Sequence, residues 1–213
     1  MSLELKMFTF NGFQENTYVI YDKQTLETAI IDPGCHSSSE QAALKEFIEA
    51  NQLKVKYLLN THCHVDHVLG NWFVKDTYQV PLLIHPLEIN TLHSVPAQAT
   101  MYGFFNYERT EPDMWIEEGQ QILLGTEALD VLFVPGHAPG HVAFYYPKNH
   151  ICIAGDVLFR ESIGRTDFPG CNHAHLIQSI KQKLFTLPDK TVIYPGHGPS
   201  TTIAHEKKYN PFL

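Results

Sequence analysis

The chain has few basic residues and no cluster of them. Its 213 residues hold 15 Lys and Arg against 23 Asp and Glu, which gives a formal net charge of −8 at pH 7. No Lys- or Arg-rich run occurs anywhere along it. Because proteins meet phosphate backbones with basic patches, nucleic acid is excluded as an expected partner.

Long apolar runs and paired cysteines are also missing. No apolar stretch approaches the roughly 20 residues that a membrane-spanning helix needs, so no membrane association is expected. The start, M-S-L-E-L-K-M-F, has neither the basic nor the apolar region of a secretory signal. The four cysteines form no C-x-x-C pair; they are Cys35, Cys63, Cys152 and Cys171. We therefore expect a reduced, cytoplasmic protein.

The hydrophobic content of 44% is enough for one substantial core. No internal linker, low-complexity segment or strong repeat divides the chain. A single domain over residues 1–213 is therefore expected.

Short strands dominate the expected secondary structure. Alternating or β-branched runs predict strands over residues 3–10, 17–21, 28–31, 55–59, 82–85, 121–124, 129–134, 142–146, 151–154 and 191–194. Helices are expected over 38–50, 68–78, 173–185 and 202–209, with a short one from Pro86. Ser38 and Gln41 match a capping box for the first helix. Many short strands with few helices favour an α/β (α+β) arrangement of two packed sheets with helices outside.

Residues 95–112 show no clear periodicity and carry four aromatic side chains, Tyr102, Phe104, Phe105 and Tyr107. An irregular stretch of this length is uncommon inside a compact domain, and lids or binding loops are one usual reason. The other interpretation is that these aromatics simply cover the core. The sequence leaves both open.

The segment 60–70, N-T-H-C-H-V-D-H-V-L-G, concentrates potential metal ligands. It follows a predicted strand and places His62, His64, Asp66 and His67 within six residues. Imidazole nitrogen and carboxylate oxygen are ligands that zinc, iron and manganese accept. Neighbours on a short loop point in different directions, so the four cannot all bind one ion. A pair of metals sharing the loop is the natural interpretation.

Three later turns repeat this design, each with a glycine directly before a polar residue at a strand end. The pairs are Gly136-His137, Gly155-Asp156 and Gly196-His197. Glycine lets the backbone bend sharply, so side chains from several strand ends can converge on one point. Five of the 13 histidines are thereby assigned to metal. The other eight are expected at the surface or hydrogen-bonded in the core, and they are His36, His85, His93, His141, His150, His173, His175 and His205.

With H-x-H-x-D-H and these turns, the sequence resembles the metallo-β-lactamase superfamily, and within it the hydroxyacylglutathione hydrolase (glyoxalase II) type. The resemblance implies an αββα four-layer sandwich with the metal site at one edge of the two sheets. It implies two divalent metal ions, most simply zinc, with iron or manganese as alternatives. By motif, the first metal would be bound by His62, His64 and His137, the second by Asp66, His67 and His197, with Asp156 bridging both. His141 would be structural or support the ligands, and Cys63 would be packed beneath the loop.

The chemistry implied is hydrolysis of a small-molecule thioester or ester, for example S-lactoylglutathione. Two metals about 3.5 to 4 Å apart hold a hydroxide and lower its pKa, and this hydroxide would attack the carbonyl. Asp66 would act in catalysis by orienting the nucleophile besides binding metal. A thiolate leaving group, with a pKa near 8.5, departs with little help from an acid.

The segment 164–168, G-R-T-D-F, is expected to contact substrate through Arg165, Asp167 and Phe168. In full-length glyoxalase II, a lysine matching Arg165 and a tyrosine matching Asp167 help to hold glutathione. A local ion pair between Arg165 and Asp167 that shapes the loop is the alternative. Full-length glyoxalase II also continues into a helical domain, whereas this chain stops at Leu213.

Other members of the superfamily are alternatives. A persulfide dioxygenase would use one iron held by His62, His137 and Asp156. A lactonase shares all seven ligands, and a non-catalytic metal-binding module is the least favoured option because no ligand position is damaged. Many β-lactamases of this fold carry cysteine or serine where Asp156 stands, which disfavours antibiotic hydrolysis. Superfamily nucleases normally add a further domain or arm. The oligomeric state is not readable from the sequence.

Overall fold

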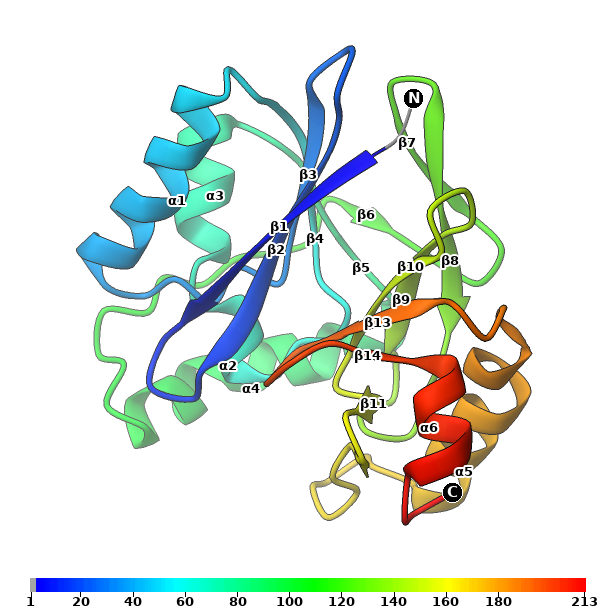
Figure 1. Ribbon diagram of the computed structural model, residues 1–213. Coiled ribbons are helices and arrows are strands. Elements are labelled where there is room, and N and C mark those ends of the chain that lie inside the picture. Colours follow the sequence, from blue (N-terminus) through cyan, green and yellow to red (C-terminus); the bar gives the residue numbers. More distant parts are fainter. Residues whose placement is uncertain (1–2) are drawn as a thin grey trace.

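Two six-stranded sheets packed together form the centre of the computed structural model, which describes residues 3–213 (Figure 1). The first sheet has the order β1 (Leu3–Phe10), β2 (Glu15–Asp22), β3 (Glu27–Ile31), β4 (Lys54–Leu59), β5 (Leu82–Ile84) and β6 (Met114–Trp115). The second has the order β14 (Thr201–Thr202), β13 (Val192–Pro195), β10 (Ile151–Gly155), β9 (Val142–Tyr146), β8 (Glu127–Phe133) and β7 (Gln121–Leu124). A short hairpin of β11 (Leu158–Phe159) and β12 (Ser162–Ile163) follows β10.

Helices cover the outer faces of both sheets (Figure 1). Beside the first sheet lie α1 (Ser38–Ala50) and α3 (Asn71–Tyr78), and beside the second lie α5 (His173–Gln182) and α6 (Ile203–Tyr209). Shorter or edge elements are α2 (Val65–Val68), η1 (Pro86–Glu88), α4 (Ile89–Met101) and η2 (Leu184–Thr186). The predicted arrangement of two sheets with helices outside is confirmed.

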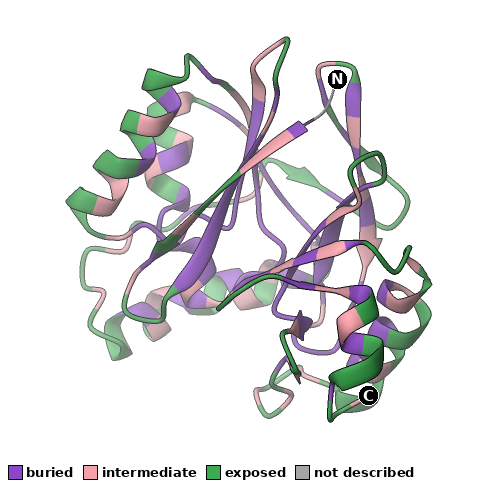
Figure 2. Cartoon of the chain, in the orientation of Figure 1, coloured by how far each residue is buried: buried purple, intermediate pink, exposed green. Residues whose placement is uncertain are grey.

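Strand alternation explains why three layers of core form. Successive side chains of a strand point to opposite faces of its sheet. In β2, Tyr18 and Ile20 join the cluster between the two sheets, whereas Val19 joins the cluster beneath α1 and α3. Residues such as Leu176 and Ile180 of α5 pack on the outer face of the second sheet. Figure 2 shows the result, with buried strands inside and exposed residues on the outward side of the helices.

The predicted helix over residues 68–78 is wrong in one respect, because the chain forms two helices with a break at Gly70. The Gly70 amide donates a hydrogen bond to the Pro33 carbonyl oxygen at 2.7 Å. A Cβ at Gly70 would lie 2.5 Å from the Cys35 sulfur. The close approach of the turn after β3 therefore separates α2 from α3, and no helical periodicity reports such a contact.

Two further predictions need correction. The capping box of α1 lies one residue earlier than predicted, since Ser37 and Glu40, not Ser38 and Gln41, exchange the cap hydrogen bonds. The first part of the stretch 95–112 is helical, because α4 continues to Met101 despite Pro96 within it. Burial of Leu92, Val95 and Ala99 on one face stabilises this helix. Beyond Met101 the chain is irregular as predicted. Among residues 3–213, no helix combines the length and apolar character needed to cross a membrane.

Candidate metal centre

All seven predicted ligands lie where strands end at one edge of the two sheets. The segment after β4 carries four of them, two in the loop and two on α2, and the others follow β8, β10 and β13. Strand ends of both sheets thus meet, and the first sheet also fixes the turn after β13. Asn16 at the start of β2 donates hydrogen bonds from its backbone to the Gly196 oxygen at 2.7 Å and from its side chain to the Gly198 oxygen at 2.8 Å.

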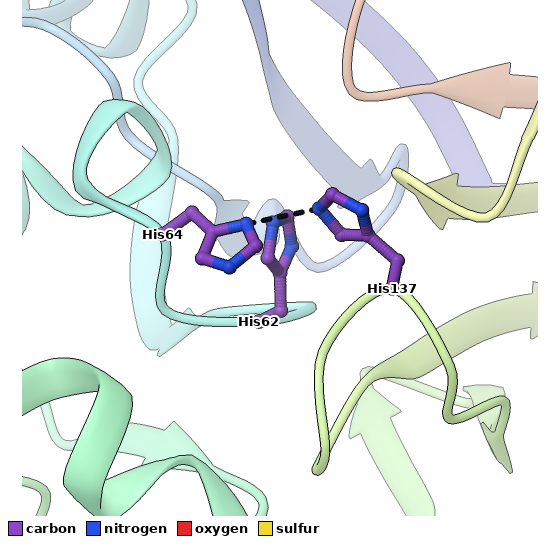
Figure 3. Close-up of side chains that lie close together, drawn as sticks. All are labelled: His62, His64 and His137. Atoms are coloured by element: carbon purple, nitrogen blue, oxygen red, sulfur yellow. Dashed lines mark hydrogen bonds between the residues drawn. The ribbon is translucent and has the colours of Figure 1, made fainter. Parts of the chain in front are cut away.

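The first group contains His62, His64 and His137, whose side chains converge from two loops (Figure 3). One ligand nitrogen of each lies within 4.8 Å of the others. His137 Nε2 and His64 Nδ1 are 2.9 Å apart, and His62 is fully buried. Three imidazole nitrogens at this spacing fit one divalent cation.

The second group contains Asp66, His67 and His197, again with ligand atoms within 4.8 Å of one another. His197 Nε2 lies 3.1 Å from Asp66 Oδ2, and His67 Nε2 lies 3.8 Å from the same oxygen. This group combines two imidazoles and a carboxylate.

Asp156 lies between the two groups. One of its oxygens, Oδ2, is 3.5 Å from His137 Nε2 and 3.6 Å from His197 Nε2. The other, Oδ1, is 3.5 Å from His67 Nε2. A single carboxylate therefore faces ligands of both groups, which is the position that a bridging ligand requires.

The polar atoms of this cluster fit bound cations. Within residues 3–213, three of its buried atoms have no hydrogen-bond partner, namely His62 Nε2, His67 Nε2 and Asp156 Oδ1. A buried polar atom without a partner costs about 1–3 kcal/mol, so native proteins rarely keep one without a reason. His62 belongs to the first group and His67 to the second, and Asp156 lies between the two groups. The His/Asp cluster is therefore suited to a binuclear metal site.

Electrostatics favour the ligand forms of most of these side chains. Burial lowers the pKa of His62 well below its usual value and that of His64 to about 3. These imidazoles are neutral and present free lone pairs. Burial would raise the pKa of Asp66 and Asp156, but His67 and neighbouring histidines outweigh it and hold both pKa values below the usual range.

His67 behaves differently in the cluster. Burial would lower its pKa, yet the carboxylates of Asp156 and Asp66 outweigh burial and raise the pKa well above its usual value. These carboxylates thus favour the protonated imidazole, so a cation at the second group competes with a proton for His67.

Asp32 orients ligands of both groups, a role that the sequence did not reveal. Its Oδ1 accepts a hydrogen bond from the Thr61 amide at 2.7 Å, and its Oδ2 accepts one from the Thr61 hydroxyl at 2.6 Å. The same hydroxyl lies 3.1 Å from His62 Nδ1, and Asp32 Oδ2 lies 3.2 Å from His67 Nδ1. In the sequence, Asp32-Pro33-Gly34 indicates only a turn after the predicted strand 28–31. The signal available in the sequence was an aspartate directly after the predicted strand 28–31, and the structure shows that it is buried.

Replacing Asp32 by asparagine is expected to weaken metal binding roughly 10- to 100-fold, the usual effect of losing a partner that orients metal ligands. The amide nitrogen cannot accept the hydrogen bonds from Thr61 and His67. Competition with a metallochromic indicator measures the affinity. The matched control is Asp76→Asn on the exposed side of α3, which should bind metal like the unmodified protein. Equal affinity in both variants would contradict this role for Asp32.

Backbone oxygens and one further carboxylate hold the remaining ligands. His137 Nδ1 donates to the Arg165 oxygen at 2.8 Å, and His197 Nδ1 donates to the Phe13 oxygen at 3.1 Å. Each imidazole therefore turns its Nε2 toward the centre. The buried Glu88 accepts from the amides of Cys63 at 2.8 Å and Gly140 at 2.7 Å, which ties the loop after β4 to the loop after β8. Cys63 itself is buried.

His141 contacts two of the predicted ligands, Asp156 and His62. Its Nε2 accepts a hydrogen bond from the Asp156 amide at 3.1 Å. Its ring stacks on that of His62, with centroids 4.6 Å apart and planes 17° from parallel. It therefore fixes two ligands without reaching the centre.

Gly196 provides space that no other residue would leave. A Cβ at this position would overlap Asp156 Oδ1 and would lie 2.6 Å from His67 Cε1. Gly196→Ala is therefore expected to displace these two ligands and to lower kcat about a hundredfold, as small misplacements of reacting groups do. Gly12→Ala is the matched control, because nothing lies within 4 Å of its added Cβ. Steady-state kinetics of both variants checks this, and equal rates would count against it.

The three predicted substrate contacts lie on the loop after β12. Arg165 and Asp167 form a two-pronged ion pair, with nitrogen–oxygen distances of 3.0 and 2.8 Å. Both side chains are mostly exposed, so this is the local ion pair that the sequence left open. The ring of Phe168 lies 5.5 Å from that of His64, which places it beside the first group.

Comparison with known proteins identifies the family to which the chain belongs. A family model described as the metallo-beta-lactamase superfamily matches residues 10–197. The chain belongs to this superfamily.

Four individual proteins of known sequence or structure match the chain over nearly its full length. The chain is 38% identical to a hydroxyacylglutathione hydrolase, GloC, of Haemophilus influenzae, over 99% of this chain and 98% of that protein. It is 36% identical to a probable metallo-hydrolase, YqgX, of Bacillus subtilis, over 94% and 92% of the two chains. Among solved structures, BLEG-1, described as a B3 metallo-beta-lactamase, superposes with a TM-score of 0.89 at 36% identity, over 99% of both chains. A di-iron-bound form of TTHA1623 superposes with a TM-score of 0.86 at 35% identity, over 98% of this chain and 100% of the other.

Proposed function

We propose that this protein hydrolyses a small-molecule thioester of the S-(2-hydroxyacyl)glutathione type, such as S-lactoylglutathione. The observation that carries the proposal is Asp156 between two complete groups of ligands, which provides a place for a metal pair rather than a single ion. The identity of 38% to the hydroxyacylglutathione hydrolase GloC supports the choice of substrate class. The hydrolytic class also accords with the probable metallo-hydrolase YqgX.

The roles of the residues follow from their positions. We assign His62, His64 and His137 to one metal, Asp66, His67 and His197 to the other, and Asp156 to both. Two divalent cations held there supply a water of lowered pKa and polarise the substrate carbonyl. Zinc suits this donor set, and iron is the alternative that the di-iron form of TTHA1623 favours.

Asp66 has a second role besides binding metal. Its pKa lies below the usual range because His67 and His197 outweigh the effect of burial, so it is ionised near neutral pH. Its carboxylate is held by His197 at 3.1 Å. An ionised, fixed carboxylate accepts a hydrogen bond from the attacking water and orients it. The thiolate leaving group needs no acid, because its pKa lies near 8.5.

A second candidate is opening of a β-lactam ring. It is favoured by the superposition on BLEG-1, described as a B3 metallo-beta-lactamase. In both reactions water attacks a carbonyl carbon, and the reactions differ in the leaving group. Lactone opening uses the same seven residues. A persulfide dioxygenase would need only His62, His137 and Asp156 and would leave the second group without a role.

The test is a panel of four substrates on protein loaded separately with zinc, iron and manganese. It measures absorbance loss from S-lactoylglutathione, hydrolysis of a chromogenic cephalosporin, proton release from an acyl-homoserine lactone and oxygen uptake with glutathione persulfide. Elemental analysis of each preparation gives the metal content. We expect the highest kcat/KM for the thioester with two metals bound per chain. Faster turnover of any other substrate, or full thioester activity with one metal, would overturn the proposal.

A further inference from the structure

Three aromatic side chains pack together beside the metal centre, and we call Phe13, Tyr102 and Phe104 the aromatic wall. The ring of Phe13 meets that of Tyr102 edge to face, with centroids 5.2 Å apart, and lies 6.0 Å from that of Phe104. Phe13 is 41% exposed and Tyr102 is 49% exposed, so the wall presents apolar surface to solvent. Contiguous exposed aromatic surface is a common mark of a binding site.

The turn between β1 and β2 attaches the wall to the second group of ligands. The carbonyl oxygen of Phe13 accepts the hydrogen bond from His197 Nδ1. Two residues earlier, the Asn11 side chain donates to the backbone oxygen of Asp66 at 3.0 Å. The turn that carries Phe13 therefore contacts the second group directly.

The same turn is held firmly. The Asn11 amide donates to Glu40 Oε1 at 2.6 Å, and Glu40 also closes the capping box of α1 with Ser37. On the other side, the ring of His36 packs edge to face on Phe104, with centroids 4.9 Å apart. A surface fixed in this way binds a ligand without first having to be ordered.

The residues next to the first group have a different character. Next to the first group, Arg165 lies over the ring of Phe168, with its guanidinium carbon 4.2 Å from the centroid, and pairs with Asp167. An exposed charged pair thus lies next to the first group, whereas exposed aromatic side chains lie on the segment that contacts the second group.

We propose that the aromatic wall binds the acyl group of the substrate and gives the enzyme a preference for 2-hydroxyacyl thioesters that carry an aryl group. This inference rests on the proposed thioester hydrolysis. A thioester with its carbonyl at the metal centre extends an acyl group one way and a thiol the other. The polar thiol portion matches the side with Arg165 and Asp167, so the acyl group faces the wall. An aryl ring there packs on Phe13 and Tyr102 as these rings pack on each other.

The experiment compares two thioesters that share glutathione, S-mandeloylglutathione with a phenyl group and S-lactoylglutathione with a methyl group. The variants are Phe13→Ala and Tyr102→Ala. We expect kcat/KM for the mandeloyl thioester to fall about tenfold more than kcat/KM for the lactoyl thioester in each variant, the effect of removing an apolar contact from a pocket. The control is Phe105→Ala, which removes a ring that is 79% exposed and lies outside the wall.

A binding measurement separates this inference from the proposed function. Calorimetric titration of metal-loaded protein with mandelate and with lactate measures recognition of the acid without hydrolysis. Tighter binding of mandelate that is lost in both wall variants supports the wall, even if neither thioester is hydrolysed and the proposed function fails. Mandelate affinity unchanged in Phe13→Ala and Tyr102→Ala, or an equal loss for both thioesters, overturns the inference. Melting curves check that the variants are folded.

Discussion

Replacing Asp156 by alanine is expected to lower kcat by roughly a thousandfold or more, since metal-ion catalysis contributes several kcal/mol and each 1.36 kcal/mol is a factor of ten. Asp156 lies between the two ligand groups, with oxygens 3.5 Å from His137 Nε2 and from His67 Nε2. Its loss leaves three imidazoles in the first group and two imidazoles with one carboxylate in the second. Metal content should fall from two to at most one per chain.

Elemental analysis and steady-state kinetics on the same preparation test this. Asp156→Asn separates charge from shape, because it keeps one oxygen in place and should retain more metal than Asp156→Ala. Asp76→Ala, on the exposed side of α3, controls for loss of a carboxylate elsewhere. Two metals per chain and an unaltered rate in Asp156→Ala would show that the carboxylate is no bridge.

Removing the metals is expected to abolish hydrolysis and to lower the melting temperature by about 10 °C. A ligand that binds only the folded state at about a thousand times its Kd stabilises by about 4 kcal/mol, and each kcal/mol shifts Tm by roughly 2–4 °C in a protein of this size. Without cations, His62 Nε2, His67 Nε2 and Asp156 Oδ1 are buried without partners. The loss of stability should therefore arise at the centre itself.

Thermal unfolding before and after dialysis against a chelator measures the effect, and adding back zinc, iron or manganese should restore both Tm and activity. Gly196→Ala serves as an internal comparison, because its displaced ligands should make its Tm respond less to metal. A chelated protein that keeps its full activity would contradict a metal-dependent reaction. An unchanged Tm would contradict the stabilising role.

The side chains that gather at the centre could be predicted from sequence because each is marked locally. His62, His64, Asp66 and His67 stand within one short segment, and each of the other three follows a glycine at a strand end. Strand alternation and turn residues likewise made the two-sheet arrangement predictable. These signals depend only on neighbours in the chain.

The features that sequence did not reveal arise from contacts between distant segments. Asp32 orients His67 across 35 positions, and the break at Gly70 follows from its approach to Cys35. The aromatic wall joins Phe13 to Tyr102 and Phe104, of which only the latter two stood out as an aromatic stretch. No periodicity or turn signal encodes such pairings, because side chains far apart in sequence meet only in the folded chain.

The division of the ligands between the two sheets has a consequence for how the protein is made. The first sheet and its loop supply four of them by residue 67, whereas His137, Asp156 and His197 come from the second sheet. During synthesis, the first half can offer a cation only an incomplete set. Contacts of such long sequence separation form late in folding. Full metal affinity should therefore appear only when the last strands have docked, so that cation uptake reports completion of the fold.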